Sequence, residues 1–260
     1  MPPPRTPLSD ACIVLVRTQG PINLGMVARL CGNLGVADLR LVAPLCEVDC
    51  SDSRKFSTHS RELLLSAPIF ATVGEAVADC GLVIGTSGDF RTSELGAHVR
   101  VQDVPRLLAS RPAAKYALVF GNEADGLDEL ELRACQAWIH LDTYGPNISY
   151  NLANAVAITG YLIASGAEIP PSDQPLAAAR EHVDSLHRYW LETLERFDYF
   201  RRTERERFAP LLGKFIGRLH LSDHDVQVLR GMLAQFNVSA FKDRFDRMPP
   251  GAADERAPLP

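Results

Sequence analysis

Short apolar runs alternate with helical patterns through the first 165 residues of the chain. Nearly continuous apolar runs, often β-branched, predict strands at residues 11–16, 39–43, 82–85, 116–120 and 138–141. Strands that are buried on both faces of a sheet have this pattern. Helical periodicity falls between them, at about residues 24–34, 60–66, 74–80, 104–110, 128–135 and 151–165. We therefore expect an α/β fold with a mostly parallel sheet and helices on both faces.

The pattern changes after residue 166. The stretch 166–175 carries three prolines and follows neither period, which is typical of a linker. Only helical patterns follow, at about 176–196, 206–219 and 222–236, and the last of these has a start signal in Ser222-Asp-His-Asp225. The C-terminal residues 248–260 include four prolines and few apolar residues, a composition typical of disorder. The sequence thus predicts a flexible N-terminus (1–10), an α/β domain (11–166), a linker (167–178), a small all-α C-terminal appendage (179–247) and a disordered tail (248–260).

Composition places the chain among ordinary globular proteins. It has 260 residues, of which 46% are hydrophobic and 23% are charged. No apolar run approaches the roughly 18–20 residues of a membrane span, and the first ten residues lack the apolar segment of a secretory signal. We therefore expect a cytoplasmic protein without a membrane partner.

Charge and cysteine content narrow the function classes. The formal net charge of −5 does not favour a general nucleic-acid binder. Locally, residues 196–218 hold seven basic and three acidic side chains, a local charge of +4 that fits a solvated helical face as well as an RNA-backbone patch. The six cysteines lack the paired spacing of a zinc site, so we expect reduced thiols acting as small core residues and no metal.

Three polar loops follow predicted strands. They are Pro21-Ile-Asn23-Leu-Gly25-Met-Val-Ala28-Arg29, Leu118-Val-Phe-Gly121-Asn-Glu123-Ala-Asp-Gly126-Leu127 and Ser149-Tyr150-Asn151-Leu-Ala-Asn154. Open α/β sheets bind ligands at the carboxyl ends of their strands, so three such loops predict one shared site. Each loop also has a simpler interpretation, with Asn23 as a helix N-cap, Arg29 as a surface charge, and Ser149 or Asn151 as a cap.

The loops after the predicted strands lack the motifs of several common enzyme classes. The glycines of the second loop have P-loop spacing, but Leu127-Asp128 replaces the Lys-Ser/Thr pair that contacts a triphosphate. No G-x-G-x-x-G follows a strand, and Gly85-Thr-Ser-Gly88 lacks the spacing of a hydrolase nucleophile elbow. A loop with free backbone amides and one carboxylate, Glu123, suits a neutral or cationic small ligand better than a polyphosphate.

Together, in this order and spacing, the three motifs resemble the SPOUT superfamily of RNA methyltransferases. The likeness is greatest to the TrmH family and its TrmJ-type members, which methylate ribose 2′-hydroxyls of tRNA. It spans about residues 11–165, and the appendage resembles the TrmJ-type members through Phe215-Ile-Gly-Arg218 and Leu229-Arg-Gly-Met-Leu233. The chain departs from the family pattern at Asn122, where Arg is frequent, at Tyr150, where Leu is usual, and over 87–100, which is hard to align.

The resemblance implies a C-terminal trefoil knot, an S-adenosyl-L-methionine site formed by the knotted loops, and a homodimer with active sites at the subunit interface. The matching positions for cofactor contact are Thr86, Gly121, Glu123, Gly126, Ile139, Leu141, Ser149 and Leu152. The matching positions of the catalytic pocket are Arg29, Asn23, Glu123, Ser149 and Asn151.

The reaction that the resemblance implies is methyl transfer to a ribose 2′-hydroxyl of tRNA, at position 32 of the anticodon loop, on cytidine or uridine. A guanidinium is a poor base, so we expect Arg29 to hold a phosphate of the target or to stabilise a developing alkoxide. Two alternatives stay open. One is the same reaction on ribosomal RNA, and the other is a non-catalytic RNA-binding relative, against which the retained pocket residues count.

Overall fold

The computed structural model describes residues 6–87, 97–166, 174–201 and 204–246. The chain divides into two compact units, Met1–Glu181 and His182–Pro260. The predicted linker segment 167–173, the N-terminal residues 1–5 and the predicted tail 248–260 lie outside the described residues.

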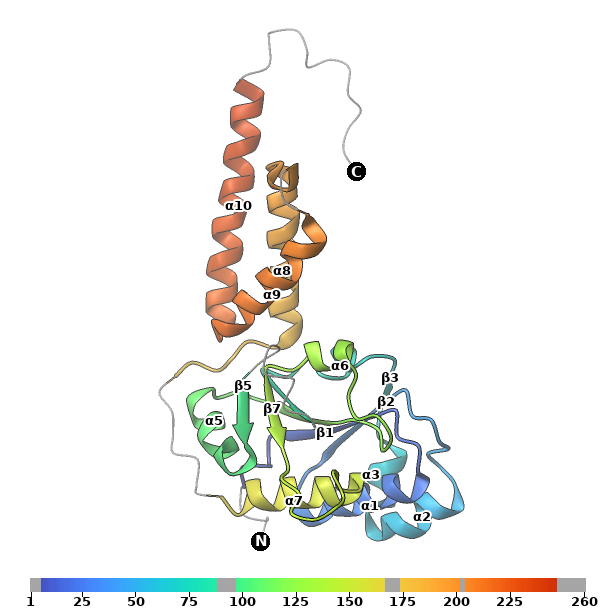
Figure 1. The fold of residues 1–260 in the computed structure, drawn as a ribbon. Coiled ribbons are helices and arrows are strands. Elements are labelled where there is room, and N and C mark those ends of the chain that lie inside the picture. Colours follow the sequence, from blue (N-terminus) through green and yellow to red (C-terminus); the bar gives the residue numbers. More distant parts are fainter. Residues whose placement is uncertain (1–5, 88–96, 167–173, 202–203, 247–260) are drawn as a thin grey trace. The chain divides into compact units, whose positions relative to one another are not determined.

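The first unit is built on a seven-stranded sheet with the order β3-β2-β1-β6-β4-β7-β5 (Figure 1). Every strand pairing that the structure describes is parallel. The strands are β1 (Ala11–Val16), β2 (Asp38–Val42), β3 (Ile69–Phe70), β4 (Leu82–Thr86), β5 (Ala97–Arg100), β6 (Tyr116–Phe120) and β7 (Ala137–His140).

The five strands predicted from apolar runs are confirmed as β1, β2, β4, β6 and β7. The pattern missed β3 and β5, which form the two edges of the sheet. An edge strand has one neighbour instead of two and needs no long apolar run. β3 has only two residues, and β5 reads Ala-His-Val-Arg, so neither gives a strong sequence signal.

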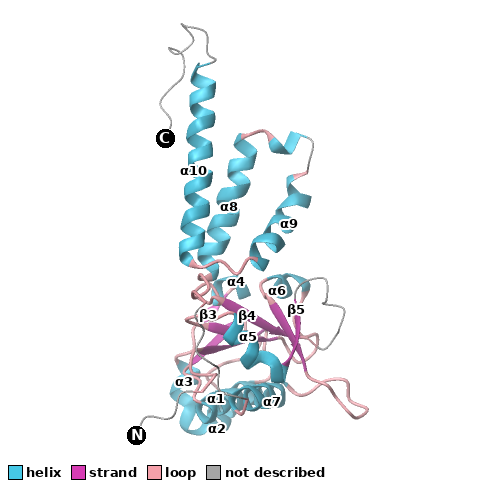
Figure 2. Cartoon of the chain, turned by 90° about the vertical axis from the view of Figure 1, so that its left-hand side faces the viewer, coloured by secondary structure: helices cyan, strands magenta, loops and turns pink. Residues whose placement is uncertain are grey.

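Helices cover both faces of the sheet, as predicted (Figure 2). Side chains of one strand alternate between two hydrophobic clusters, as the two-residue period of a strand requires: Ile13 and Leu15 of β1 lie in the larger cluster, and Val14 and Val16 in the smaller. The larger cluster packs against α1 (Pro21–Leu34), α3 (Arg61–Leu65), α5 (Val104–Ser110) and α7 (Leu152–Ala164). The smaller packs against α4 (Val73–Ala76) and α6 (Glu129–Arg133).

The first helix shows how its motif glycine is used. α1 begins at Pro21, whose ring suits the first helical position, and ends at Gly35, which has the left-handed φ of 73° and donates its N–H to the Cys31 carbonyl. A Cβ on Gly25 would lie 2.5 Å from the Ser53 carbonyl oxygen of α2 (Ser51–Ser57). Gly25 therefore allows α1 to pack closely against α2, a short helix that the periodicity did not predict.

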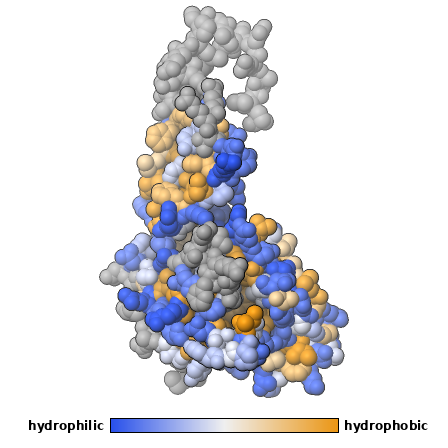
Figure 3. Space-filling view, in the orientation of Figure 1, coloured by the Kyte–Doolittle hydropathy of each residue, from blue (hydrophilic) through white to orange (hydrophobic). Residues whose placement is uncertain are grey.

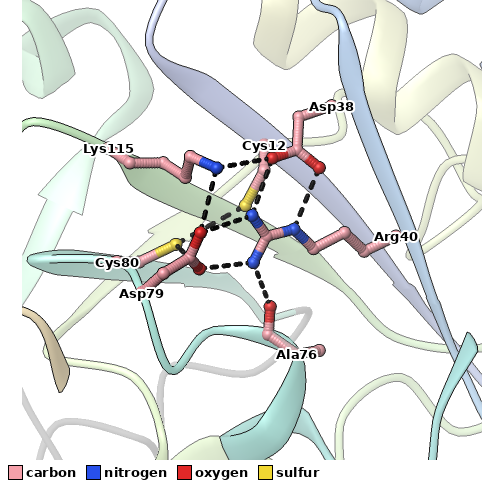
Figure 4. A network of polar contacts seen from close by, with 7 residues as sticks. All are labelled: Cys12, Asp38, Arg40, Ala76, Asp79, Cys80 and Lys115. Carbon is pink, nitrogen blue, oxygen red and sulfur yellow. Dashed lines mark hydrogen bonds and ion pairs between the residues drawn. The ribbon is translucent and has the colours of Figure 1, made fainter. Parts of the chain in front are cut away.

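An ionic network around the buried Arg40 ties together the amino-terminal ends of neighbouring strands (Figure 4). Arg40 of β2, whose side chain is only 8% exposed, donates to both carboxylate oxygens of Asp38 and of Asp79 and to the Ala76 carbonyl. Lys115, just before β6, contacts the same two carboxylates. The hydrogen bond from Arg40 is the largest influence on the pKa of Asp79 and lowers it. All six cysteines are free thiols, and Cys12 and Cys80 lie beside this network with their sulfurs 3.6 Å apart.

The end of the predicted linker and the start of α8 (Arg180–Arg196) belong to the first unit. Ala177 donates its backbone N–H to the Pro112 carbonyl, and the backbone N–H of Arg180 donates to the Cys80 carbonyl. The helix predicted from residue 176 accordingly begins at Arg180.

The second unit is helical, with α8 (Arg180–Arg196) running into it, α9 (Arg205–Arg218) and α10 (Asp223–Asp246). The predicted start signal is confirmed, since Ser222 and Asp225 exchange backbone and side-chain hydrogen bonds as a capping box. Leu191, Leu212 and Ile216 form a small core. Apolar side chains also gather on the visible surface of this unit (Figure 3). Those that are 44–62% exposed on α9, at its C-cap and on α10 include Leu211, Phe215, Leu219, Val228, Met232 and Phe236.

No helix among the described residues is both long enough and apolar enough to cross a membrane.

Candidate active site

A continuous set of hydrogen bonds joins the three sequence motifs at the carboxyl edge of the sheet. The Asn23 Nδ2 donates to Glu123 Oε1 over 2.7 Å, and the Asn151 Nδ2 donates to Asn23 Oδ1 over 3.0 Å. These residues are 100 and 128 positions apart in the chain. We call Asn23, Glu123 and Asn151 the motif triad.

The direction of the hydrogen bonds in the motif triad follows from chemistry. An ionised carboxylate can only accept, so Asn23 must present its amide nitrogen to Glu123 and its oxygen to Asn151. Asn151 uses its amide nitrogen for Asn23, and its side-chain oxygen accepts from the backbone N–H groups of Ala153 and Asn154 at the start of α7. The triad thus runs from the N-terminus of α7 to the Glu123 carboxylate.

Glu123 is the anionic end of this group. Its carboxylate also accepts from the backbone N–H groups of Gln19 and Gly20, at 3.0 and 3.1 Å. Partial burial alone would raise the pKa of Glu123, but the hydrogen bonds from Asn23 and from these amides outweigh it and hold the pKa below its ordinary value. Glu123 is therefore a fixed negative charge at neutral pH.

The two motif glycines shape the loop that carries Glu123. A Cβ on Gly121 would lie 2.1 Å from the Gly126 carbonyl carbon, and Gly126 has a φ of +70°. Asn122 and Gly126 exchange two backbone hydrogen bonds, which close the loop. The side chain of Asn122 turns inward, and its oxygen accepts from the N–H groups of Ala124 and Asp125. Glycine is needed at the first position for close approach and at the second for its left-handed backbone.

Four other predicted cofactor positions lie at the end of β4, in and just after β7, and at the start of α7. Thr86 ends β4, and its hydroxyl donates to the Val119 carbonyl of the adjacent strand. Ile139 is fully buried in the larger cluster, Leu141 packs against that cluster, and Leu152 is 5% exposed within it. Ile139 and Leu152 are therefore core residues below this edge, and Leu141 is partly buried against them.

Two predicted catalytic residues stand apart from the motif triad. Arg29 and Ser149 are exposed, and the structure gives neither side chain a hydrogen bond or ion pair to any described residue. Six positions separate Arg29 from Asn23, which on an α-helix is about 9 Å along the axis and roughly a third of a turn around it. The structure therefore brings together Asn23, Glu123 and Asn151 but not Arg29.

Of the two helix-capping interpretations, the structure supports the one for Asn151 and not the one for Asn23. Capping by Asn151 is confirmed. Asn23 is not an N-cap, since Gly20 occupies that position, and the Asn23 side chain is committed to the triad instead. Sequence reasoning missed the turn at Gln19 and Gly20, because backbone amides carry no sequence signature. It also missed Cys46, whose thiol pKa is raised by burial and by the nearby charge of Glu123.

These features define a parallel α/β protein whose three motif loops meet at the carboxyl edge of its sheet, where folds of this class bind ligands. The model of the SpoU rRNA methylase family matches residues 10–161, and the chain belongs to this family. The resemblance read from the three motifs is thereby confirmed. The knot that it implies stays a prediction.

Relatives named for a methyltransferase activity align with most of the chain. The tRNA (cytidine/uridine-2′-O-)-methyltransferase TrmJ of Klebsiella pneumoniae is 30% identical over 235 residues, which are 87% of this chain and 96% of the relative. The TrmJ of Yersinia enterocolitica is 29% identical over 95% of this chain and 96% of its own. The crystal structure of TrmJ from Z. mobilis ZM4 aligns with a TM-score of 0.75 at 25% identity, over 87% of this chain and 99% of that one.

Proposed function

We propose that the protein is a tRNA ribose 2′-O-methyltransferase that uses S-adenosyl-L-methionine and acts as a homodimer in the cytoplasm. The target is a cytidine or uridine at position 32 of the anticodon loop. The motif triad is the observation that carries this proposal, because it unites at one edge the three loops on which the family resemblance rests. The names of the relatives that span almost the whole chain support tRNA as the substrate.

The donor set at this edge fits S-adenosyl-L-methionine, which combines a flat adenine, a ribose, a sulfonium cation and an amino-acid end. Apolar side chains of Ile139, Leu141 and Leu152 stand beside backbone groups, and none of the predicted cofactor positions is basic. Among these predicted positions the one charged side chain is that of Glu123, whose lowered pKa keeps it anionic. An edge of this kind suits a cationic nucleoside and would repel a polyphosphate.

The residues of the chain then have separate tasks. When bound, S-adenosyl-L-methionine supplies an activated methyl group, so the protein's part is orientation of the ribose oxygen, worth roughly 7–11 kcal/mol in favourable cases. Glu123 already accepts three hydrogen bonds and has a lowered pKa, which makes it a poor proton acceptor and a good fixed point for the triad. Arg29 holds the target phosphate or stabilises the alkoxide that forms at the ribose.

The surface of the first unit supports the proposed dimer. The 13 residues of α7 include no charged side chain, although Tyr161 on this helix is 68% exposed. Ile22 at the start of α1 is 40% exposed and lies seven positions before Arg29, and so on nearly the same helix face. A helix that is apolar all round is normally buried. A second copy covering this surface would also give Arg29 an active site to enter, that of the partner subunit.

Radiolabelled methyl transfer tests the activity and the substrate. The purified protein should label unmodified bulk tRNA and not ribosomal RNA, and the label should map to a ribose at position 32. Labelling of ribosomal RNA alone would establish the alternative substrate. Binding of tRNA without any transfer would establish the non-catalytic relative.

Mixed dimers test the placement of Arg29. The variants Arg29→Ala and Gly121→Ala should each be inactive, the first with normal cofactor affinity. Co-expressed in equal amounts they should recover about a quarter of the wild-type rate, because half of the dimers are mixed and each has one intact site. Failure to recover activity would show that Arg29 serves the site of its own chain.

A further inference from the structure

Arg17 holds the glycine loop from outside, at a position that no motif includes. It follows β1 directly and has the unusual φ of 49° for a residue other than glycine. Its Nη2 donates to the Gly126 carbonyl over 3.2 Å, and its Nε and Nη2 donate to the two oxygens of Glu131 at 2.6 and 2.8 Å. A bidentate pair of this kind fixes the direction of the guanidinium as well as its position.

The partner of Arg17 is itself held in place. Glu131 is 13% exposed, and it forms a capping box with Asp128 at the start of α6, directly after the loop. Asp128 N–H donates to Glu131 Oε2, the same oxygen that Arg17 contacts. Arg17 therefore links the end of β1, the last carbonyl of the loop and the first turn of α6.

The turn that carries Arg17 touches the loop a second time. Gln19 and Gly20 donate their backbone N–H groups to Glu123, in the middle of the loop, while Arg17 reaches Gly126 at its end. The loop is thus fixed at two points by one turn. Asn122, where the family often has Arg, turns inward to the loop's own backbone, so it makes no bridge to this turn.

We propose that Arg17 is a positioning residue that sets the conformation of the loop 121–127 for the methyl donor. This inference rests on the proposed function of the loop as part of the cofactor site. Arg17 acts through Gly126 and Glu131 and need not touch the donor. Its removal frees the end of the loop while leaving the motif triad intact, so it should weaken donor binding and spare the chemical step.

The experiment compares Arg17→Met with Arg54→Met. Arg54 is a matched control because it makes the same bidentate contact, to Asp49, on the exposed side of α2. In Arg17→Met the KM for S-adenosyl-L-methionine should rise about tenfold, while kcat and the KM for tRNA stay within about twofold of wild type. Arg54→Met should change none of the three. A purely structural loss would instead lower kcat at unchanged KM, by reducing the folded fraction, and would overturn the proposal.

Two further measurements keep the inference separate from the proposed function. Hydrogen exchange of the amides of 121–128, without any cofactor, should speed up about tenfold in Arg17→Met and not in Arg54→Met. If the wild type transfers no methyl group, this exchange result still decides whether Arg17 holds the loop, and unchanged exchange would refute it. Glu131→Gln keeps the cap acceptor but loses the ion pair, so it should reproduce the KM effect if Arg17→Met folds poorly. Normal KM and normal exchange in Glu131→Gln would contradict the mechanism.

Discussion

The substitution Asn23→Asp inverts one contact of the motif triad and preserves the rest. Aspartate has nearly the shape of asparagine, and its oxygen can still accept from Asn151. The atom facing Glu123 changes from an amide donor to a carboxylate oxygen, at the 2.7 Å separation of the original hydrogen bond. The variant therefore tests whether the first and second motifs meet as the structure shows.

The cost can be worked from that separation. Two unit charges 2.7 Å apart repel by about 1.5 kcal/mol in water and by about 6 kcal/mol at an effective dielectric constant of 20. A lost hydrogen bond to a charged group adds roughly 1.5–3 kcal/mol. Glu123 is exposed, so screening keeps the electrostatic part near its lower limit. We expect a loss of about 3–4.5 kcal/mol in the free energy of unfolding at neutral pH.

The pH dependence gives the sharper test. In the wild type the pKa of Glu123 is lowered, so its contribution to stability is present above the unfolded pKa and is lost as the pH falls. In Asn23→Asp the paired carboxylates raise the folded pKa of one group, and stability falls as the pH rises through that value. The difference between wild type and variant should thus be largest near pH 7.5 and smaller by about 1 kcal/mol or more near pH 4.5.

Urea unfolding at both pH values measures this difference, with Asn154→Asp as the control. Asn154 lies in the first turn of α7, where a new negative charge is favourable, so the control should be neutral or stabilised by a few tenths of a kcal/mol. Equal and pH-independent stabilities of Asn23→Asp and wild type would show that Asn23 and Glu123 do not meet, and the shared site would lose its foundation.

Two further substitutions test the glycine loop 121–127 and the Arg40 network at the amino-terminal ends of the strands. Gly121→Ala places a Cβ against the backbone at Gly126, so calorimetric affinity for S-adenosyl-L-methionine should fall more than tenfold, whereas Gly145→Ala, with nothing within 4 Å of its Cβ, should bind normally. Arg40→Met leaves the carboxylates of Asp38 and Asp79 without their buried partner. Urea unfolding at pH 7 should show a loss of about 3 kcal/mol in the free energy of unfolding. This is near the low end of the range for broken buried ion pairs, because Asp79 is 48% exposed. A loss below about 1 kcal/mol would mean that solvent already screens this network.

The central fold could be predicted because central parallel strands leave a strong pattern. All six residues of β1 are buried, three in the cluster on each face of the sheet. The sequence of β1 therefore does not alternate between apolar and polar residues and is a continuous apolar run. The edges had no such constraint, and β3 and β5 were missed for that reason. The short helix α2 was missed because it packs through the backbone at Ser53 and Ser57, against a glycine, and not through an apolar stripe.

The site could be predicted only in part. The motifs identified Asn23, Glu123 and Asn151 as neighbours in function, and the structure places them in contact. The backbone donors of the turn after β1 were beyond reach, since any residue offers the same N–H group. Arg17 was missed for another reason, because an arginine after a strand has many ordinary surface roles and only its two partners distinguish it.

The amino-terminal and carboxyl-terminal ends of the strands are stabilised by different kinds of contact. At the amino-terminal edge Arg40 is buried among carboxylates, and such a network tolerates little change because a broken pair leaves an unpaired charge. At the carboxyl ends Asn23, Glu123 and Asn151 make polar contacts near solvent, which contribute roughly 1 kcal/mol for the neutral pair and roughly 1.5–3 kcal/mol for the bond to the Glu123 carboxylate. The ionic network thus stabilises the amino-terminal ends of the strands, and the motif triad and Arg17 order the loops at the carboxyl ends, where we propose that the methyl donor binds.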